Sequence, residues 1–186
     1  MVLTEAQKLK YYKNKEKIHK VVKQNIEKRK HIVYGARALN AHFPPHLDRH
    51  TEDWDVYSNT PKKTAMRVEK KLDRTYGGDY FYVEQAVHPG TYKVKSRVTR
   101  TGVADYTKPD QTIPYKTIGG KRYVKLSHVK KHIKKTLKDP NAKFRHDKDR
   151  EALQRIKLYE NSKKKKRKVS RKPRGVNDLA RAWGWM

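Results

Sequence analysis

Residues 51–57 (TEDWDVY) read as a short β-strand that carries two acids. The stretch has aromatic and β-branched residues, and a turn signal (SNTP) follows it directly. Because side chains alternate along a strand, Asp53 and Asp55 are expected on one face, about 6.5–7 Å apart along the strand axis. Two like charges so placed repel each other, and a pair of divalent cations about 3.5–4 Å apart is one reason to build such an arrangement. A solvated, charged strand edge is the other interpretation of the same pattern.

The charge balance predicts the class of partner. The chain has 186 residues, of which 34% are hydrophobic and 36% charged, and its net charge is +29. A core of modest size and a polyanionic partner, nucleic acid first, are therefore expected. No apolar run approaches the roughly 20 residues of a spanning helix, so a membrane partner is not expected. Cysteine is absent, which excludes disulfides and thiolate metal sites and fits an intracellular location.

Composition divides the chain into three parts. Residues 1–30 predict a basic amphipathic helix, in which Thr4 and Gln7 form a capping box. Its apolar stripe is expected to comprise Leu9, Tyr12, Ile18, Val22 and Ile26. Residues 31–160 predict the folded domain. Residues 161–186, with ten Lys/Arg and one Asp, predict a basic tail that ends in a segment containing two tryptophans.

Periodicity and turn signals within residues 31–160 predict an α+β (α/β) domain with a small mixed sheet. A strand at 31–34 ends at Gly35, and a short helix follows as far as residue 42. Such a junction leaves backbone N–H groups free at a helix N-terminus, where a phosphate can bind, although glycine there is often a matter of geometry alone. The remaining expected elements are a helix over 61–74, strands over 79–87, 92–98 and 103–106, a loop over 107–120, a helix of about ten residues from 127, and a helix over 145–159.

A third acid, Asp105, lies in the otherwise apolar strand at 103–106. A strand that ends in Gly, a short helix, a strand with Asp-x-Asp, a helix, and a later strand with a third acid together resemble the nucleotidyltransferase fold of the polymerase-β superfamily. More narrowly, the chain is similar to the poly(A) polymerase catalytic domains of large DNA viruses. The matching pieces are residues 32–40 (IVYGARALN), 53–58 (DWDVYS), 88–94 (HPGTYKV), 103–106 (VADY), 139–140 (DP), 144–145 (FR), and 148–149 with Leu153.

The resemblance implies an activity and its metal ligands. Asp53, Asp55 and Asp105 would hold two Mg²⁺ ions, with Mn²⁺ as an alternative, and would serve as the catalytic carboxylates. The implied reaction is the template-independent addition of nucleotides, from ATP or another NTP, to RNA 3′ ends. Phosphoryl-type transfer depends mainly on positioning and charge neutralisation, and three acids with two cations supply both.

The same resemblance implies nucleotide contacts by Gly35 and Ala36 through their backbone N–H groups, and by Arg37, Arg145 and Lys148. Two departures bear on it. The family usually carries Gly-Gly or Gly-Ser where this chain has Gly35-Ala36, so a hydroxyl that could reach the phosphate is missing. The chain is also short, so the grip on RNA would come from the basic helix, the tail or a partner subunit.

The tail contains a run typical of nuclear import or nucleic-acid binding, Lys164, Lys165, Lys166, Arg167 and Lys168. A like-charge run is also commonly disordered, and a protein partner or a larger assembly could order it. Three functional interpretations therefore remain open. One is an RNA-extending enzyme, the second is a structural protein that packages nucleic acid or belongs to a virion, and the third is a nucleotidyltransferase with another substrate. If the protein is viral, its expected location is the cytoplasmic viral factory or the virion, with the nucleus as an alternative.

Overall fold

The computed structural model describes residues 3–170, with side chains as far as Lys164. It divides into two compact units, of which the first ends at Val129 and the second begins at Lys130, within helix α5 (Leu126–Thr136). Among the described residues, no helix combines the length and the apolar character needed to cross a lipid bilayer.

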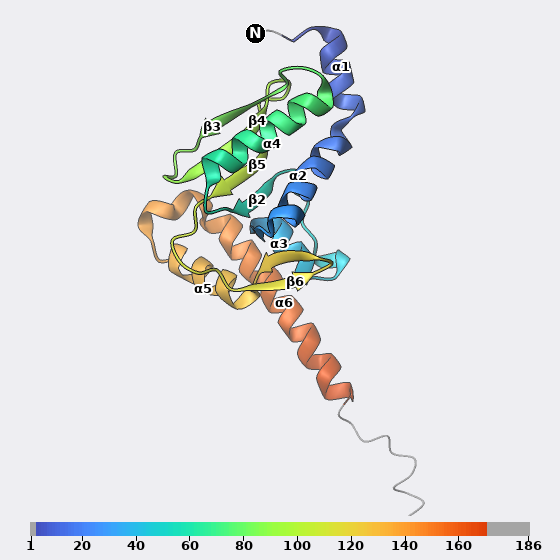
Figure 1. Cartoon of the computed structure of the whole chain (residues 1–186). Coiled ribbons are helices and arrows are strands. Elements are labelled where there is room, and N and C mark those ends of the chain that lie inside the picture. The colour runs from blue at the N-terminus through green and yellow to red at the C-terminus, as the bar shows by residue number, and fades with distance from the viewer. Residues whose placement is uncertain (1–2, 171–186) are drawn as a thin grey trace, which may run out of the picture. The chain divides into compact units, whose positions relative to one another are not determined.

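The first unit is built on a seven-stranded mixed sheet in the order β3-β4-β5-β2-β1-β7-β6. The pairs β2–β5 and β1–β7 are parallel, and the other neighbours are antiparallel. The predicted mixed α+β architecture is therefore confirmed (Figure 1). The strands are β1 (Ile32–Tyr34), β2 (Trp54–Tyr57), β3 (Phe81–Gln85), β4 (Thr91–Ser96), β5 (Gly102–Thr107), β6 (Tyr115–Ile118) and β7 (Lys121–Val124).

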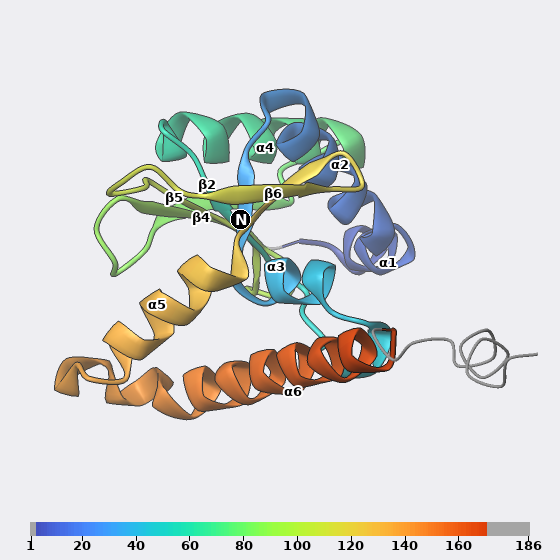
Figure 2. The ribbon, with the colours of Figure 1, turned by 90° about the horizontal axis from the view of Figure 1, so that it is seen from below.

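The two faces of the sheet are covered differently. Helix α4 (Pro61–Tyr76) packs on β3, β4 and β5, and α2 (Lys15–Arg29) packs beside it, over a core that includes Val33, Val56 and Tyr106. Helix α3 (Gly35–His42) contacts β1, β2 and β7 on the other face (Figure 2). Because strand side chains alternate, the residues between the core positions point to the α3 side. A short 3₁₀ turn (Pro45–Leu47) follows α3.

The N-terminal region is two helices, α1 (Glu5–Lys13) and α2, where the sequence predicted one. Asn14 separates them: its backbone is non-helical, and its side-chain Nδ2 donates to the carbonyl of Lys10. Asparagine competes for backbone partners in this way and so favours helix ends. The break also changes the apolar stripe, because Tyr11 is buried whereas Leu9 and Tyr12 are more than half exposed. The capping box at Thr4 is confirmed.

The predicted loop at 107–120 is wrong, since it contains β6 and leads into a hairpin with β7. Gly119 and Gly120 form the turn between the strands, with φ of 54° and 75°. Two consecutive positive φ values are what a type I′ hairpin turn requires, and its twist matches that of the strands. The Gly-Gly pair between two alternating segments was the signal for this hairpin.

The second unit consists of the end of α5, a 3₁₀ segment (Pro140–Arg145) and the long helix α6 (His146–Ser170). Ile156 is fully buried, and Lys130 Nζ forms an ion pair with Glu160 at 2.8 Å. Helix α6 continues across residue 161, where the sequence predicted the start of the tail. The backbone of the basic run at 164–168 is thus helical. Residues 171–186, including the two tryptophans, lie outside the described part of the chain.

Candidate active site

Four polar side chains form a row across neighbouring strands. Tyr34 on β1 lies opposite Asp55 on β2, Asp55 lies opposite Asp105 on β5, and Asp105 lies opposite Lys93 on β4. Directly opposed residues project from the same face of a sheet. This is the face that carries α3, because the alternating residues Val56 and Ala104 enter the core under α4. Two of the three predicted aspartates are therefore neighbours in the sheet, on one face.

Asp105 is a largely enclosed carboxylate of the row. Its side chain is 16% exposed, and Lys93 Nζ lies 3.0 Å from its Oδ2. Burial raises the pKa of Asp105, the negative charge of Asp53 raises it further, and the ammonium of Lys93 opposes the shift. Asp53, which directly precedes β2, is thus close enough to Asp105 for their charges to interact. Its own carboxylate accepts a hydrogen bond from the hydroxyl of Thr51 at 2.7 Å.

Gly35 and Asp55 are in close contact at the N-terminus of α3. Gly35 begins the helix with a φ of 66°, and a Cβ built on it would overlap the carboxylate of Asp55. Both the backbone conformation and the close approach therefore require glycine at this position. The helix has no side-chain cap, and the positive end of its dipole favours an anion. The predicted strand–glycine–helix junction thus places its backbone N–H groups beside the second aspartate.

Arg37 holds the segment that carries Asp53. Its Nε donates to the carbonyl of Asp53 at 2.6 Å, and one terminal nitrogen donates to the carbonyls of Thr51 and Glu52, each at 3.0 Å. The guanidinium also stacks on Trp54, with 4.2 Å between its central carbon and the ring centroid. These donors face the protein's own backbone and position the segment before β2, and the predicted nucleotide contact of Arg37 stays a prediction.

Hydroxyl groups lie beside the acids on the same face. The hydroxyl of Tyr34 is 2.8 Å from that of Thr107, and the ring of Tyr34 stacks on Tyr57 at 4.3 Å between centroids. Burial and the charge of Asp55 both raise the pKa of Tyr34, so its phenol stays protonated. Sequence reasoning missed Tyr34, Thr107 and Lys93 as site residues. Two signals were available: Thr107 is two residues after Asp105, and Lys93 alternates with apolar residues along its strand. The register between the strands was needed to use either signal.

The residues present suit a hard divalent cation. Carboxylate oxygens are the ligands that Mg²⁺ and Mn²⁺ prefer, and Asp55 on β2, Asp105 on β5 and Asp53, just before β2, supply them. Their oxygens do not all lie within 4.8 Å of one another, and Lys93 holds Asp105. Within residues 3–164, the acids that do converge so closely are Glu69, Asp73 and Asp79. Asp73 there accepts from the N–H groups of Tyr80 and Phe81 and thus caps the turn after α4.

The other predicted nucleotide contacts lie in the second unit. Arg145 forms an ion pair of 3.1 Å with the buried Asp149, and Lys148 is exposed. Lys164 is exposed on α6, whereas the side chains of Lys165, Lys166, Arg167 and Lys168 are outside the described part. The roles assigned to these residues stay predictions.

Comparison with solved structures supports the fold. The crystal structure of the Megavirus polyadenylate synthase matches 78% of this chain with a TM-score of 0.65 and 20% identity. JHP933 from Helicobacter pylori matches 73% of the chain, with a TM-score of 0.39 and 16% identity, and 58% of its own length is covered. The chain has a nucleotidyltransferase fold that resembles a viral poly(A) polymerase. It spans only 31% of the length of the Megavirus protein. No protein-family model matches the sequence, and a search of curated proteins finds no significant match.

Proposed function

We propose that this chain is a nucleotidyltransferase that extends RNA 3′ ends without a template, with Asp53, Asp55 and Asp105 as its catalytic carboxylates. The observation that carries the proposal is the direct pairing of Asp55 with Asp105 in a parallel ladder, beside a helix N-terminus that begins at Gly35. The likeness in fold to the Megavirus polyadenylate synthase supports the substrate class.

Each residue has a defined task in this reaction. The N–H groups at the start of α3 bind phosphate oxygens, which the helix dipole also attracts. Asp53 and Asp55 would hold divalent cations, and Asp105, the enclosed acid, would favour deprotonation of the attacking 3′-hydroxyl. Such cations would supply charge neutralisation at the triphosphate. Arg37 keeps Asp53 in place through three backbone carbonyls.

The test is incubation with labelled ATP, Mg²⁺ and a short RNA. Extension of the RNA is expected, and the double variant Asp53→Asn, Asp55→Asn should abolish it while melting at the same temperature as the native chain. CTP, GTP and UTP in parallel reactions identify the nucleotide. Extension by the variant, or none by the native chain with any nucleotide in Mg²⁺ or Mn²⁺, contradicts the proposal.

One observation favours a second candidate, a basic scaffold protein that binds nucleic acid without catalysis. The ammonium of Lys93 already neutralises Asp105, as a cation would. The variant Lys93→Met separates the two candidates. In an enzyme, Lys93→Met should change the Mg²⁺ concentration that gives half-maximal RNA extension. A scaffold should not extend RNA, and neither Lys93→Met nor the double variant of Asp53 and Asp55 should alter that result.

A further inference from the structure

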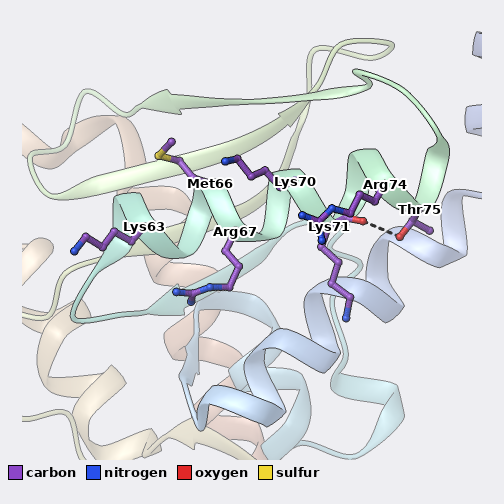
Figure 3. Close-up of a pocket in the computed structure, with 7 residues that line it drawn as sticks. All are labelled: Lys63, Met66, Arg67, Lys70, Lys71, Arg74 and Thr75. Atoms are coloured by element: carbon purple, nitrogen blue, oxygen red, sulfur yellow. Dashed lines mark hydrogen bonds between the residues drawn. The ribbon is translucent and has the colours of Figure 1, made fainter.

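The outer face of α4 carries a stripe of positive charge. Lys63, Arg67, Lys70 and Arg74 are all exposed and recur at intervals of four, three and four residues, which keeps them on one side of a helix. At about 1.5 Å per residue the stripe is about 16 Å long. These side chains line a surface depression together with Met66, Lys71 and Thr75 (Figure 3).

The stripe lacks ion-pair partners within the part of the chain that the structure describes, although the charge of Glu69 attracts Lys70. No ion pair there includes any of its four cations. The two acids of α4, Glu69 and Asp73, converge with Asp79 instead, and Asp73 accepts from backbone N–H groups at the start of β3. Like charges one helical turn apart destabilise a helix by a few tenths of a kcal/mol per pair. A bound polyanion would remove that cost.

Helix α2 extends the same surface. Lys71 Nζ donates to Gln24 Oε1 at 2.9 Å, so Gln24 lies on the side of α2 that meets α4. Lys20 and Lys28, four residues before and after Gln24, are exposed along that side. Figure 3 shows Arg67 and Lys71 pointing from α4 toward α2. Two neighbouring helices thus present cations to the same region.

The chemistry of this surface selects its partner. Met66 is the one large apolar side chain among the lining residues of the depression, and none of them is aromatic. Protein interfaces are enriched in aromatic anchors, and membrane-surface helices carry a broad apolar face, so neither partner is favoured. Without aromatic side chains the surface offers no stacking platform for bases. It suits a regular array of phosphates, which attract cations whatever the base sequence.

We propose that this two-helix basic surface, Lys20, Lys28, Lys63, Arg67, Lys70, Lys71 and Arg74, binds the phosphate backbone of a nucleic acid strand without reading its sequence. Because α4 covers the sheet face opposite Asp55 and Asp105, the strand bound here is not the segment that reaches those carboxylates. The surface holds the body of a nucleic acid, and this role does not depend on the proposed catalytic function.

The test is the salt dependence of binding to a fluorescently labelled, unstructured 20-nucleotide RNA. In the variant Lys63→Gln, Arg67→Gln, Lys70→Gln, Arg74→Gln, the slope of log K against log salt should be shallower by about two to three, since each single-strand phosphate contact contributes about 0.7. A DNA strand of the same sequence should behave alike. Glutamine is a good helix former, so α4 is expected to stay folded.

A matched control comes from the end of α5 and the residues just after it. Lys131, Lys134, Lys135 and Lys138 are also exposed, and their change to Gln removes the same charge. This control should leave the slope within about one unit of the native value, and so should Asp53→Asn, Asp55→Asn. Equal losses in the α4 variant and the control would mean diffuse attraction by net charge and overturn the proposal. Tighter binding to vesicles with 30% phosphatidylserine than to RNA, lost in the α4 variant, would also overturn it.

Discussion

At the scale of single residues, two constraints meet at Gly35: its backbone conformation and its close contact with Asp55. Its positive φ costs any other residue about 1–2 kcal/mol, and a Cβ would also displace Asp55. We expect Gly35→Ala to lower the free energy of unfolding by about 2–3 kcal/mol in urea melts and to abolish RNA extension.

Gly119→Ala is the matched control for this variant. Gly119 has a similar φ of 54°, but nothing lies within 4 Å of a Cβ built there. It should cost only the backbone strain, about 1–2 kcal/mol, and keep activity. Equal costs at the two positions would show that the contact between Gly35 and Asp55 adds no constraint.

The burial of Asp105 gives a prediction about pH. Because its pKa is raised in the folded state, folding favours the protonated acid, and the stability it contributes at low pH is lost as pH rises through the folded pKa. Asp105→Asn, which cannot ionise, should therefore melt higher than the native chain at pH 7 while losing activity. The two melting temperatures should converge below about pH 4, the ordinary carboxyl range. A variant that melts lower at pH 7 would show that the ion pair with Lys93 outweighs the cost of burial.

Much of the residue-level site could be predicted and some could not. Asp53, Asp55 and Asp105 were chosen as candidates because acids in short apolar strands are conspicuous in any sequence. Lys93 was not, because a cross-strand neighbour depends on register, and register is fixed by turns and packing far from the residue. The predicted metal role of the three acids stays a prediction.

At the scale of elements, Arg37 joins α3 to the segment before β2. Its hydrogen bonds to three carbonyls and its stacking on Trp54 use the planar guanidinium, which lysine lacks. Arg37→Lys should lower the free energy of unfolding by about 1.5–3 kcal/mol and reduce kcat through the displacement of Asp53. If Arg37→Lys left the free energy of unfolding unchanged and raised the KM for ATP, the result would support the nucleotide contact that the sequence predicted for Arg37.

Other elements differ in how far the sequence could reach. Helix α4 was predicted closely because Pro61 can begin a helix and Gly77, with a φ of 71°, can end it. The single N-terminal helix was wrong because its polar residues fit a helix on either side of Asn14, and the break depends on partners such as Tyr76, whose hydroxyl donates to the Asn14 carbonyl. Local chemistry thus identifies helix ends better than it identifies interruptions that distant residues stabilise.

At the scale of the whole molecule, the net charge of +29 predicts that repulsion between like charges lowers the stability of the folded state. Added NaCl screens charges more than about 10 Å apart at 0.1 M, whereas close ion pairs such as Lys93–Asp105 are affected less. The melting temperature of the nucleic-acid-free protein should therefore rise between 0.05 and 0.5 M NaCl, by about 2–4 °C if about 1 kcal/mol of repulsion is removed.

Charge removal on α4 locates the origin of that rise. The change of Lys63, Arg67, Lys70 and Arg74 to Gln should raise the melting temperature at 0.05 M NaCl and reduce its dependence on salt, because like charges on one helix face are closest there. A short RNA should stabilise the native chain more than this variant at low salt, by mass action on the folded state. A melting temperature that falls as NaCl is added would mean that attractive ion pairs outweigh repulsion. The basic surface of α2 and α4 would then be stable without a polyanion. Its positive charge would no longer be evidence that a polyanion binds there.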